Sequence, residues 1–353
     1  MIHNPAGNRP HRKRRESGMI REHSETERES KLRFIQVPIS HQEESLASAV
    51  IQGLSKPQKE LPSRFFYDIE GSRLFEQITR LPEYYLTRCE TEILARYSPE
   101  IVAASGPCLQ VVEFGSGSSE KTRLLLRAAV HGRSSVEYVP IDISSEFLRD
   151  SSDELVDAVD GVFVTALAGD YLDSLKAIPD HDSGRLFLFL GSTIGNFLRE
   201  EAVEFLTQVR LTMRPQDRLL VGVDLKKAPA LVEPAYNDVE GVTELFNKNI
   251  LARINRELCG KFDLGSFAHA APWVEESSRI EMRLVSKINQ VVAIDGLDRA
   301  FSFKKGEYIH TENSHKWCAG TFAQICRDAG LSTRSTWLDS KGWFALNLLA
   351  IEC

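Results

Sequence analysis

Residues 109–122 are LQVVEFGSGSSEKT, an apolar run that leads directly into two closely spaced glycines. The run predicts a buried strand, and residues 120–130 predict the helix that follows it. Gly115 and Gly117 allow a sharp turn and let a ligand approach the backbone without meeting a Cβ. The first helical turn offers free N–H groups and the positive end of the helix dipole. This unit predicts a nucleoside-binding site at the end of the strand.

Strands and helices continue to alternate beyond this unit. The expected strands are 109–114, 136–141, 161–166, 185–190 and 218–224. Such alternation implies a parallel, doubly wound sheet with right-handed crossovers. A helix at 319–329 and two strands at 332–338 and 343–351, joined by a hairpin-type turn, end the chain. This arrangement differs from that of dehydrogenases and resembles class I methyltransferases, whose last strand inserts antiparallel.

The resemblance implies an α/β fold with a Rossmann-like seven-stranded sheet and a C-terminal antiparallel hairpin. The SAM-binding methyltransferase core is then expected at 90–224 and 317–353. Residues 36–89 and 225–316 would combine into a second, discontinuous α+β domain that binds the substrate. Residues 1–35 are expected to be a disordered basic tail.

Residues after the glycines and strands indicate which nucleoside is bound. Ser118 and Ser119 replace the third glycine of the dinucleotide fingerprint, which disfavours NAD and suits S-adenosylmethionine (SAM). Asp142 ends the second strand, where a carboxylate can accept both ribose hydroxyls, and Asp170 follows the third, near an adenine amino group. Lys121 is in reach of the SAM carboxylate. As single residues, the aspartates also suit helix caps and the lysine also suits solvent.

The loop after the fourth strand is Gly191-Ser-Thr-Ile-Gly-Asn-Phe197. In methyltransferases this loop faces the transferable methyl group, and Asn196 offers two donors and an acceptor to a polar substrate. Alternatively, Asn196 is a left-handed turn residue. The chain lacks the Asn-Pro-Pro-Tyr and Asp-Pro-Pro-Tyr motifs, which disfavours amide and nucleobase substrates.

Charge and cysteine content restrict the partners. The 353 residues carry 43 Lys and Arg against 50 Asp and Glu, and this net charge of −7 disfavours a general nucleic-acid or membrane-surface binder. No apolar run reaches the length of a membrane-spanning helix. The basic block within residues 9–15 is interpreted as part of a solvated tail, with a nuclear-localisation signal as the alternative. Six scattered cysteines without metal-binding spacing predict a reduced, cytoplasmic protein without a metal.

Longer motifs resemble a known family. Residues 66–85 are FYDIEGSRLFEQITRLPEYY and residues 112–122 are VEFGSGSSEKT. Together with Gly191–Phe197 they resemble the signatures of histidine-specific Nα-methyltransferases, which make trimethylhistidine (hercynine) for ergothioneine biosynthesis. The resemblance extends from about residue 60 to the C-terminus. Leu86 departs from the proline that usually follows the paired tyrosines.

The family's pocket residues can be carried over by position. The resemblance implies a histidine site of Tyr67, Tyr84, Asn196, Tyr236, Met282, Glu312 and Ser314. It implies Tyr67 and Asn196 as the catalytic pair, Glu312 and Ser314 as partners of the imidazole, and Tyr236 with Asn196 as partners of the carboxylate. The expected cofactor residues are Gly115, Gly117, Lys121, Asp142 and Asp170. Taken singly, Met282 and Tyr84 also suit an apolar core, and Glu312 also suits a polar surface loop.

The implied activity is threefold transfer of the SAM methyl group to the α-amine of free L-histidine by a monomeric enzyme. An N-methyltransferase for another amino acid, such as tryptophan, is the first alternative, but an indole would need an apolar wall in place of Glu312 and Ser314. A catalytically silent SAM-binding protein is the second, and the presence of both residue sets disfavours it. An NAD-dependent oxidoreductase is disfavoured by the missing third glycine and by the C-terminal hairpin.

Overall fold

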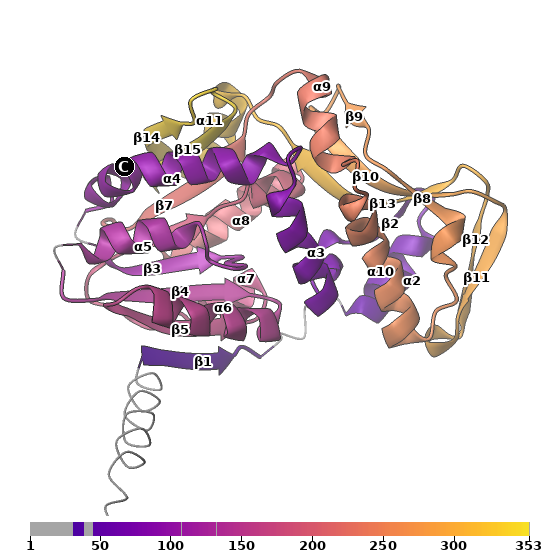
Figure 1. Cartoon of the computed structure of the whole chain (residues 1–353), viewed down its shortest axis with the longest axis horizontal. Helices are drawn as coiled ribbons and strands as arrows, with labels where there is room; N and C mark the ends of the chain where they lie inside the picture. The colour runs from indigo at the N-terminus through magenta and orange to yellow at the C-terminus, as the bar shows by residue number, and fades with distance from the viewer. Residues whose placement is uncertain (1–30, 39–44, 107, 132, 353) are drawn as a thin grey trace, which may run out of the picture.

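The computed structural model describes residues 31–38, 45–106, 108–131 and 133–352. The protein has two lobes, a larger one around an eight-stranded sheet and a smaller one around a five-stranded sheet (Figure 1). The predicted basic tail lies outside the described residues as far as residue 30.

The large sheet has the strand order β1-β5-β4-β3-β6-β7-β15-β14. In chain order, the bounds are β1 (Leu32–Gln36), β3 (Cys108–Phe114), β4 (Val136–Asp142), β5 (Val162–Ala168), β6 (Gly184–Phe189), β7 (Arg218–Asp224), β14 (Leu331–Leu338) and β15 (Phe344–Ile351). The strands from β1 to β7 are parallel, and β15 lies antiparallel between β7 and β14. This confirms the predicted α/β methyltransferase sheet with its C-terminal hairpin.

The sheet has one strand more than predicted. β1 pairs in parallel with β5, with Leu32 opposite Val164, so the prediction of a disordered tail is wrong from residue 32 onward. Five residues beside a charged segment are too few to show a strand pattern. The open edge of β5 supplies their hydrogen-bond partners, and the Arg149 guanidinium lies 3.9 Å from the centre of the Phe34 ring.

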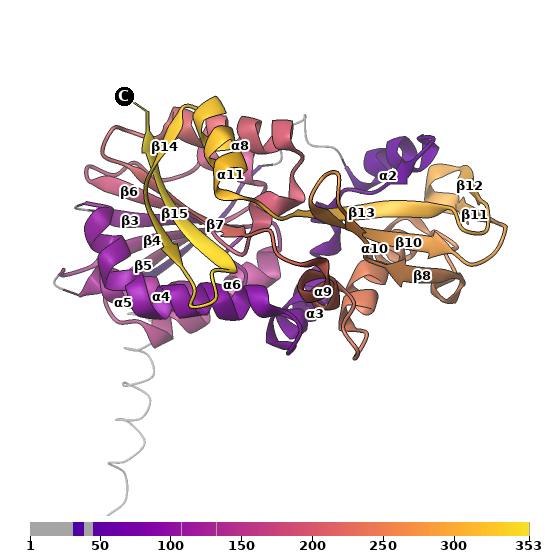
Figure 2. The same ribbon diagram turned by 90° about the horizontal axis from the view of Figure 1, so that it is seen from above.

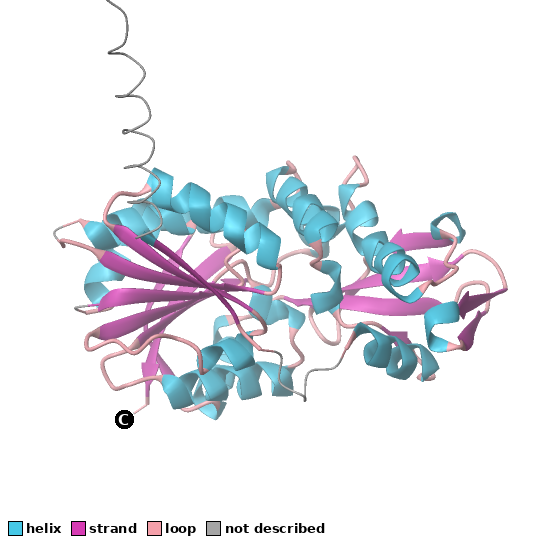
Figure 3. Ribbon diagram, turned by 90° about the horizontal axis from the view of Figure 1, so that it is seen from below, coloured by secondary structure: helices cyan, strands magenta, loops and turns pink. Residues whose placement is uncertain are grey.

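Helices cover both faces of the large sheet (Figure 3). One face carries α4 (Tyr85–Ala104), α5 (Thr122–Val130) and α6 (Ser145–Ala158), and the other carries α8 (Arg199–Thr212) and α11 (Ala319–Asp328). β6 is buried along its whole length, as a parallel strand covered on both faces should be. The carboxyl ends of β3 and β4 point toward the smaller lobe (Figure 1).

The smaller lobe combines two distant parts of the chain. Its sheet has the order β2-β13-β10-β8, with β9 also on β10, and a separate hairpin joins β11 to β12. Two helices, α2 and α10, lie on opposite sides of this sheet, and α3 faces the larger lobe (Figures 1 and 2). The bounds are α2 (Leu46–Ser55), β2 (Lys59–Glu60), α3 (Ile69–Arg80), α10 (Val242–Leu258), β8 (Phe267–Ala270), β9 (Trp273–Val274), β10 (Arg279–Ser286), β11 (Gln290–Ile294), β12 (Arg299–Phe303) and β13 (Tyr308–His315).

Sequence analysis missed strand β13. Its sequence, YIHTENSH, is mostly polar, yet it lies between β2 and β10 and residues 311–314 are buried. Buried polar groups there find tertiary partners: the Thr311 hydroxyl donates to Asn247 Oδ1 at 2.7 Å. Glu312 therefore lies on a buried strand, and its alternative placement in a polar surface loop is wrong.

Helix α3 begins at a closely packed junction. The Asp68 carboxylate accepts hydrogen bonds from the Gly71 N–H and from Asn249 Nδ2, each at 2.8 Å, and also from Arg256. Partial burial by itself would raise the pKa of Asp68, but these hydrogen bonds outweigh it and lower the pKa. A Cβ on Gly71 would lie 1.7 Å from the Phe66 carbonyl oxygen, so only glycine fits there.

Replacing Asp68 by alanine is expected to lower the free energy of unfolding by about 1–2 kcal/mol at pH 7, because a helix cap and links to α10 are lost. Because the pKa is lowered in the folded protein, this stabilisation is fully present above the pKa of the unfolded chain, about 3.9. It is lost as the pH falls through the lower pKa of the folded protein. Urea denaturation at pH 7 and pH 3 measures both effects. The exposed Glu70→Ala serves as the control, and equal stability of the two variants at pH 7 would contradict the role of Asp68.

Candidate active site

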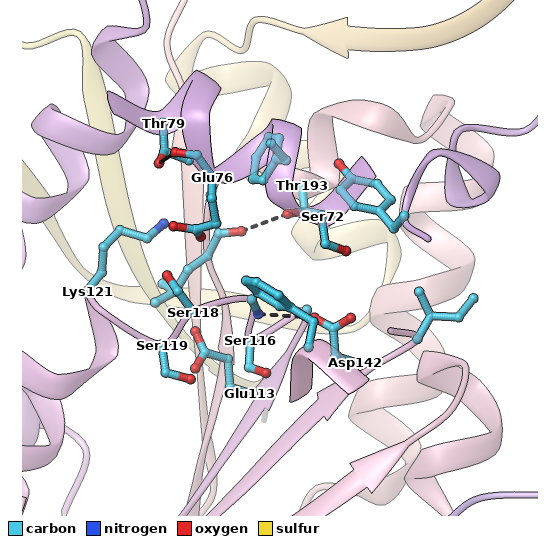
Figure 4. Close-up of a pocket in the computed structure, with 18 of the residues that line it drawn as sticks. Ser72, Glu76, Thr79, Glu113, Ser116, Ser118, Ser119, Lys121, Asp142 and Thr193 are labelled. Carbon is cyan, nitrogen blue, oxygen red and sulfur yellow. Dashed lines mark hydrogen bonds between the residues drawn. The ribbon is translucent and has the colours of Figure 1, made fainter. Parts of the chain in front are cut away.

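The candidate active site is a cavity between α3 and the loops that follow β3, β4, β5 and β6. Its empty volume, open mouth included, is about 1440 Å³, which is room for a nucleoside beside an amino acid. Figure 4 shows Ser72, Glu76 and Thr79 of α3 on one wall, with Lys121 and Asp142 on the other. The predicted site residues that line the cavity are Tyr67, Tyr84, Gly115, Gly117, Lys121, Asp142, Asp170 and Asn196.

The glycine loop after β3 has the backbone shape that the sequence predicts. Gly115 and Gly117 have φ values of +69° and +52°, which favour glycine. A Cβ on Gly115 would lie 2.6 Å from the Tyr171 hydroxyl oxygen. Ser116 is one of the residues that line this cavity, and its Oγ is buried without a hydrogen-bond partner among the described residues. An open backbone and an unpaired polar atom suit a polar ligand such as SAM.

Both predicted aspartates lie at strand ends in this cavity. Asp142 accepts hydrogen bonds from the Gly117 N–H at 3.1 Å and the Ser144 N–H at 2.9 Å. Burial raises the pKa of Asp142, and these hydrogen bonds oppose the rise. Asp170 caps the short helix α7 (Tyr171–Leu175) by accepting from the Leu172 N–H at 2.9 Å. Asp170 is therefore a helix cap as well as a cavity residue.

Asp142→Ala is expected to weaken binding of S-adenosylhomocysteine about 10- to 100-fold, because a buried carboxylate can accept two ribose hydroxyls. Isothermal titration calorimetry measures the affinity directly. Asp150→Ala, an exposed position on α6, is the control and should bind like the wild type. Wild-type affinity in Asp142→Ala would remove this residue from the cofactor site.

Lys121 has a buried partner that sequence analysis missed. Glu90 on α4 is fully buried, forms an ion pair with Lys121, and accepts the Gly191 N–H at 2.9 and 3.0 Å. The acid thereby joins the glycine loop after β3 to the loop after β6. A signal for it exists in the sequence, since Glu90 interrupts a helical stripe of apolar residues that includes Leu86 and Ile93.

A second buried acid, Glu113, stands at the end of β3. It accepts hydrogen bonds from the Tyr138 hydroxyl and from Thr122 Oγ1, the latter at 2.8 Å. Burial raises the pKa of Glu113 to about 7 despite these hydrogen bonds. Its partners come from β4 and the start of α5, so Glu113 holds the glycine loop against the sheet.

Aromatic rings form the wall of the cavity on the side of the smaller lobe. The Tyr67 ring lies 5.7 Å from that of Phe75 and 5.6 Å from that of Phe246, both edge-on. The Tyr84 ring lies 6.2 Å from that of Tyr236. Burial raises the pKa of Tyr67 well above its ordinary value, and the nearby Glu312 adds to this. Tyr67 therefore stays a neutral phenol at physiological pH.

Asn196 and Glu312 meet where the two lobes join. Asn196 ends the 3-10 helix η2 (Thr193–Asn196), and its Nδ2 lies 3.5 Å from Glu312 Oε2, a long contact. The left-handed residues of this loop are Gly191 and Ser192, with φ +74° and +59°, and Asn196 is not one of them. Glu312 is 9 % exposed, and burial raises its pKa to about 8, with Lys316 opposing the rise.

Tyr236 and Ser314 form a hydroxyl pair behind this contact, with oxygens 2.7 Å apart. Lys316 donates to both oxygens, each at 2.7 Å, and its ammonium lies 2.8 Å from Asp224 Oδ2. Sequence analysis missed Lys316 and Asp224. A lysine two residues after a predicted site serine was the available signal.

Met282 lies beside Glu312 in the sheet of the smaller lobe. The two residues are directly paired between β10 and β13, so their side chains share one face. Met282 is buried in the apolar core. Three of the seven residues predicted to bind histidine thus line the cavity. The other four adjoin it through the Tyr84–Tyr236 and Asn196–Glu312 contacts.

The described part of the chain holds neither a cluster suited to a metal ion nor a helix suited to crossing a membrane. Within residues 31–38, 45–106, 108–131 and 133–352, no three His, Cys, Asp or Glu side chains gather closely enough to hold a metal ion. No helix in those same ranges combines the length and apolar character that crossing a membrane requires.

Comparison with known proteins agrees with this geometry. The sequence profile of the family described as "Histidine-specific methyltransferase, SAM-dependent" matches residues 46–351. The histidine N-alpha-methyltransferase of Mycolicibacterium smegmatis is 42 % identical, covering 86 % of this chain and 94 % of that protein. The enzyme of the same name from Mycobacterium tuberculosis is 44 % identical, covering 87 % and 95 %. Ergothioneine biosynthesis protein 1 of Neurospora crassa is 32 % identical over 83 % of this chain and 33 % of its own length. The chain therefore belongs to the SAM-dependent, histidine-specific methyltransferase family.

Proposed function

We propose that this protein methylates the α-amine of free L-histidine three times, using SAM, to give hercynine. The observation that carries the proposal is the position of Glu312, a buried acid that contacts Asn196 of the cavity and shares a face of β13 with Ser314 of the hydroxyl pair. An imidazole has two nitrogens, and a carboxyl group and a hydroxyl group can each partner one of them. The 42–44 % identity to two named histidine N-alpha-methyltransferases supports the same substrate.

The site residues have distinct tasks in this reaction. The glycine loop and Asp142 would hold SAM, which would supply an electrophilic methyl group whose C–S bond would break as the N–C bond to histidine formed, with S-adenosylhomocysteine as the leaving group. The α-amine must first lose a proton to water or to a nearby group, because an ammonium has no lone pair. Asn196 and Tyr236 bind the carboxylate, Glu312 and Ser314 bind the imidazole, and their joint effect is to hold the nitrogen in line with the methyl group.

Tyr67 is the residue assigned to the amine. As a neutral phenol it can accept a hydrogen bond from the amine or donate one to its lone pair. Its ring also tolerates the positive charge that grows as methyl groups are added, because an aromatic face attracts cations. A fixed hydrogen-bond acceptor would instead lose its partner as each N–H is replaced by a methyl group.

An N-methyltransferase for tryptophan is the main alternative. An indole has one donor and no second polar nitrogen, so it would leave Glu312 or the hydroxyl pair without a partner in a buried site. The chain's polar pair thus favours imidazole. A catalytically silent SAM-binding protein would not need these polar groups.

Incubation of the purified protein with SAM and each standard amino acid, followed by mass spectrometry, tests the proposal. Histidine alone should gain three methyl groups in place of three hydrogens. Methylation of tryptophan in preference to histidine, or of no amino acid, would contradict it. Ergothioneine biosynthesis as the pathway is supported by the name of the Neurospora crassa relative. A monomeric state and a cytoplasmic location stay predictions.

A further inference from the structure

Lys316 lies behind the histidine half of the site as a buried cation. Its side chain is 0 % exposed. Its Nζ lies 2.8 Å from Asp224 Oδ2 and donates hydrogen bonds to the hydroxyl oxygens of Tyr236 and Ser314, each at 2.7 Å. An ammonium group has three donors and no acceptor, so these partners use its full hydrogen-bonding capacity. Lys316 therefore affects a ligand only through its neighbours.

The hydroxyl groups of Tyr236 and Ser314 are left with restricted directions. Because Lys316 can only donate, both hydroxyl oxygens accept from it and must point their own hydrogens elsewhere. The two oxygens lie 2.7 Å apart, so one hydroxyl donates to the other. Among the described residues, the remaining hydroxyl hydrogen has no recorded acceptor. One O–H is thus left over at the hydroxyl pair, and Ser314 lies on the same face of β13 as Glu312.

We propose that Lys316 is a positioning residue that orients the Tyr236–Ser314 hydroxyl pair so that one O–H donates to the bound amino acid. Asp224 holds Lys316 in place through an ion pair between two fully buried side chains. The inference rests on the proposed function, because it takes the ligand of this hydroxyl pair to be histidine. In a dry site, a lysine in this position also favours an anionic acceptor, such as the ligand's carboxylate.

A second lysine, whose side chain is 6 % exposed, provides a matched control. Lys227 forms an ion pair with the other oxygen of Asp224, and it donates to the Tyr85 hydroxyl at 2.9 Å and to the Leu225 carbonyl at 2.6 Å. None of its recorded hydrogen bonds goes to Tyr236 or Ser314. Removal of either lysine perturbs the same buried carboxylate, but only one of them contacts the hydroxyl pair.

Lys316→Met and Lys227→Met in the full chain test the inference. Initial rates are measured with histidine varied at saturating SAM, and affinity for S-adenosylhomocysteine is measured by calorimetry. Lys316→Met should raise the KM for histidine about 10- to 100-fold, whereas Lys227→Met should stay within about threefold of the wild type. Both variants should bind S-adenosylhomocysteine within about twofold of the wild type. A general structural defect would instead raise the KM for histidine and weaken S-adenosylhomocysteine binding in both lysine variants.

Lys316→Gln is the second variant if the methionine variant does not fold. It keeps a hydrogen-bond donor without the charge. Its KM for histidine should be higher than that of Lys227→Met and, where Lys316→Met folds, lower than that of Lys316→Met. A histidine KM equal to the wild type in a folded Lys316 variant, or an equal rise in the Lys227 variant, would overturn the positioning role. A wild-type protein that does not methylate histidine would overturn the proposed function and this inference together.

Discussion

Replacing Glu312 by alanine is expected to raise the KM for histidine about 100-fold and to leave the affinity for SAM within about twofold of the wild type. Glu312 is 9 % exposed, so a hydrogen bond from its carboxyl group to the imidazole forms away from water. Loss of a hydrogen bond to a charged or buried acidic group costs about 1.5–3 kcal/mol. The cofactor residues lie on other loops, which is why the two affinities should separate.

The protonation of Glu312 gives a second readout. Burial raises its pKa from 4.5 to about 8 in the folded protein. The unfolded chain loses the proton at the lower value, so between these values the folded protein binds more protons and its stability falls as the pH rises. Glu312→Gln removes this loss. The free energy of unfolding of the variant relative to the wild type should therefore increase from pH 5 to pH 8, as measured by chemical denaturation.

Glu281 supplies the control for the KM measurement. It is a buried acid on the neighbouring strand, 8 % exposed, and forms ion pairs with Arg279 and Arg283. It pairs with Asn313 and so faces the opposite side of the sheet from Glu312. Glu281→Ala should lower stability and keep the wild-type KM for histidine. If Glu312→Ala also keeps that KM, the imidazole assignment is wrong.

Glu90→Ala is expected to lower the free energy of unfolding by about 3–5 kcal/mol and to weaken SAM binding. The change leaves Lys121 without its ion pair and the Gly191 N–H without its acceptor, both beside the cavity. The protein makes room for this acid: a Cβ on Gly222 would lie 2.3 Å from Glu90 Oε1. Two cofactor-side loops lose their common partner at once, which is why stability and binding should fall together.

Two variants bracket this effect. Glu90→Gln keeps an acceptor for the Gly191 N–H and should lose less stability than Glu90→Ala. Glu92→Ala, on the same helix, removes an exposed hydrogen bond to Ser340 and should cost less than about 1 kcal/mol. Denaturant unfolding with calorimetry of S-adenosylhomocysteine measures both properties. Similar stability of Glu90→Ala and Glu92→Ala would show that Glu90 does not join the two loops.

Local patterns were sufficient for most of the fold. The predicted strands 218–224 and 343–351 match β7 and β15 to within one residue. Their signal is an apolar run or an alternation within one short segment, which the chain carries wherever it lies. β1 and β13 carry no such signal, because β1 is a five-residue edge strand and β13 is mostly polar. Both are strands because of the neighbours they pair with.

The sequence by itself determined the parallel sheet with its C-terminal hairpin, the glycine loop and the strand-end positions of Asp142 and Asp170. The residues predicted to bind histidine followed from family motifs and not from spacing. Only the tertiary structure decided that Glu90 pairs with Lys121, and that Lys316 joins Asp224 to the hydroxyls of Tyr236 and Ser314. Strand and helix patterns arise from neighbours a few residues apart. A buried charge depends on partners that only folding brings within 3 Å, and no local pattern encodes that distance.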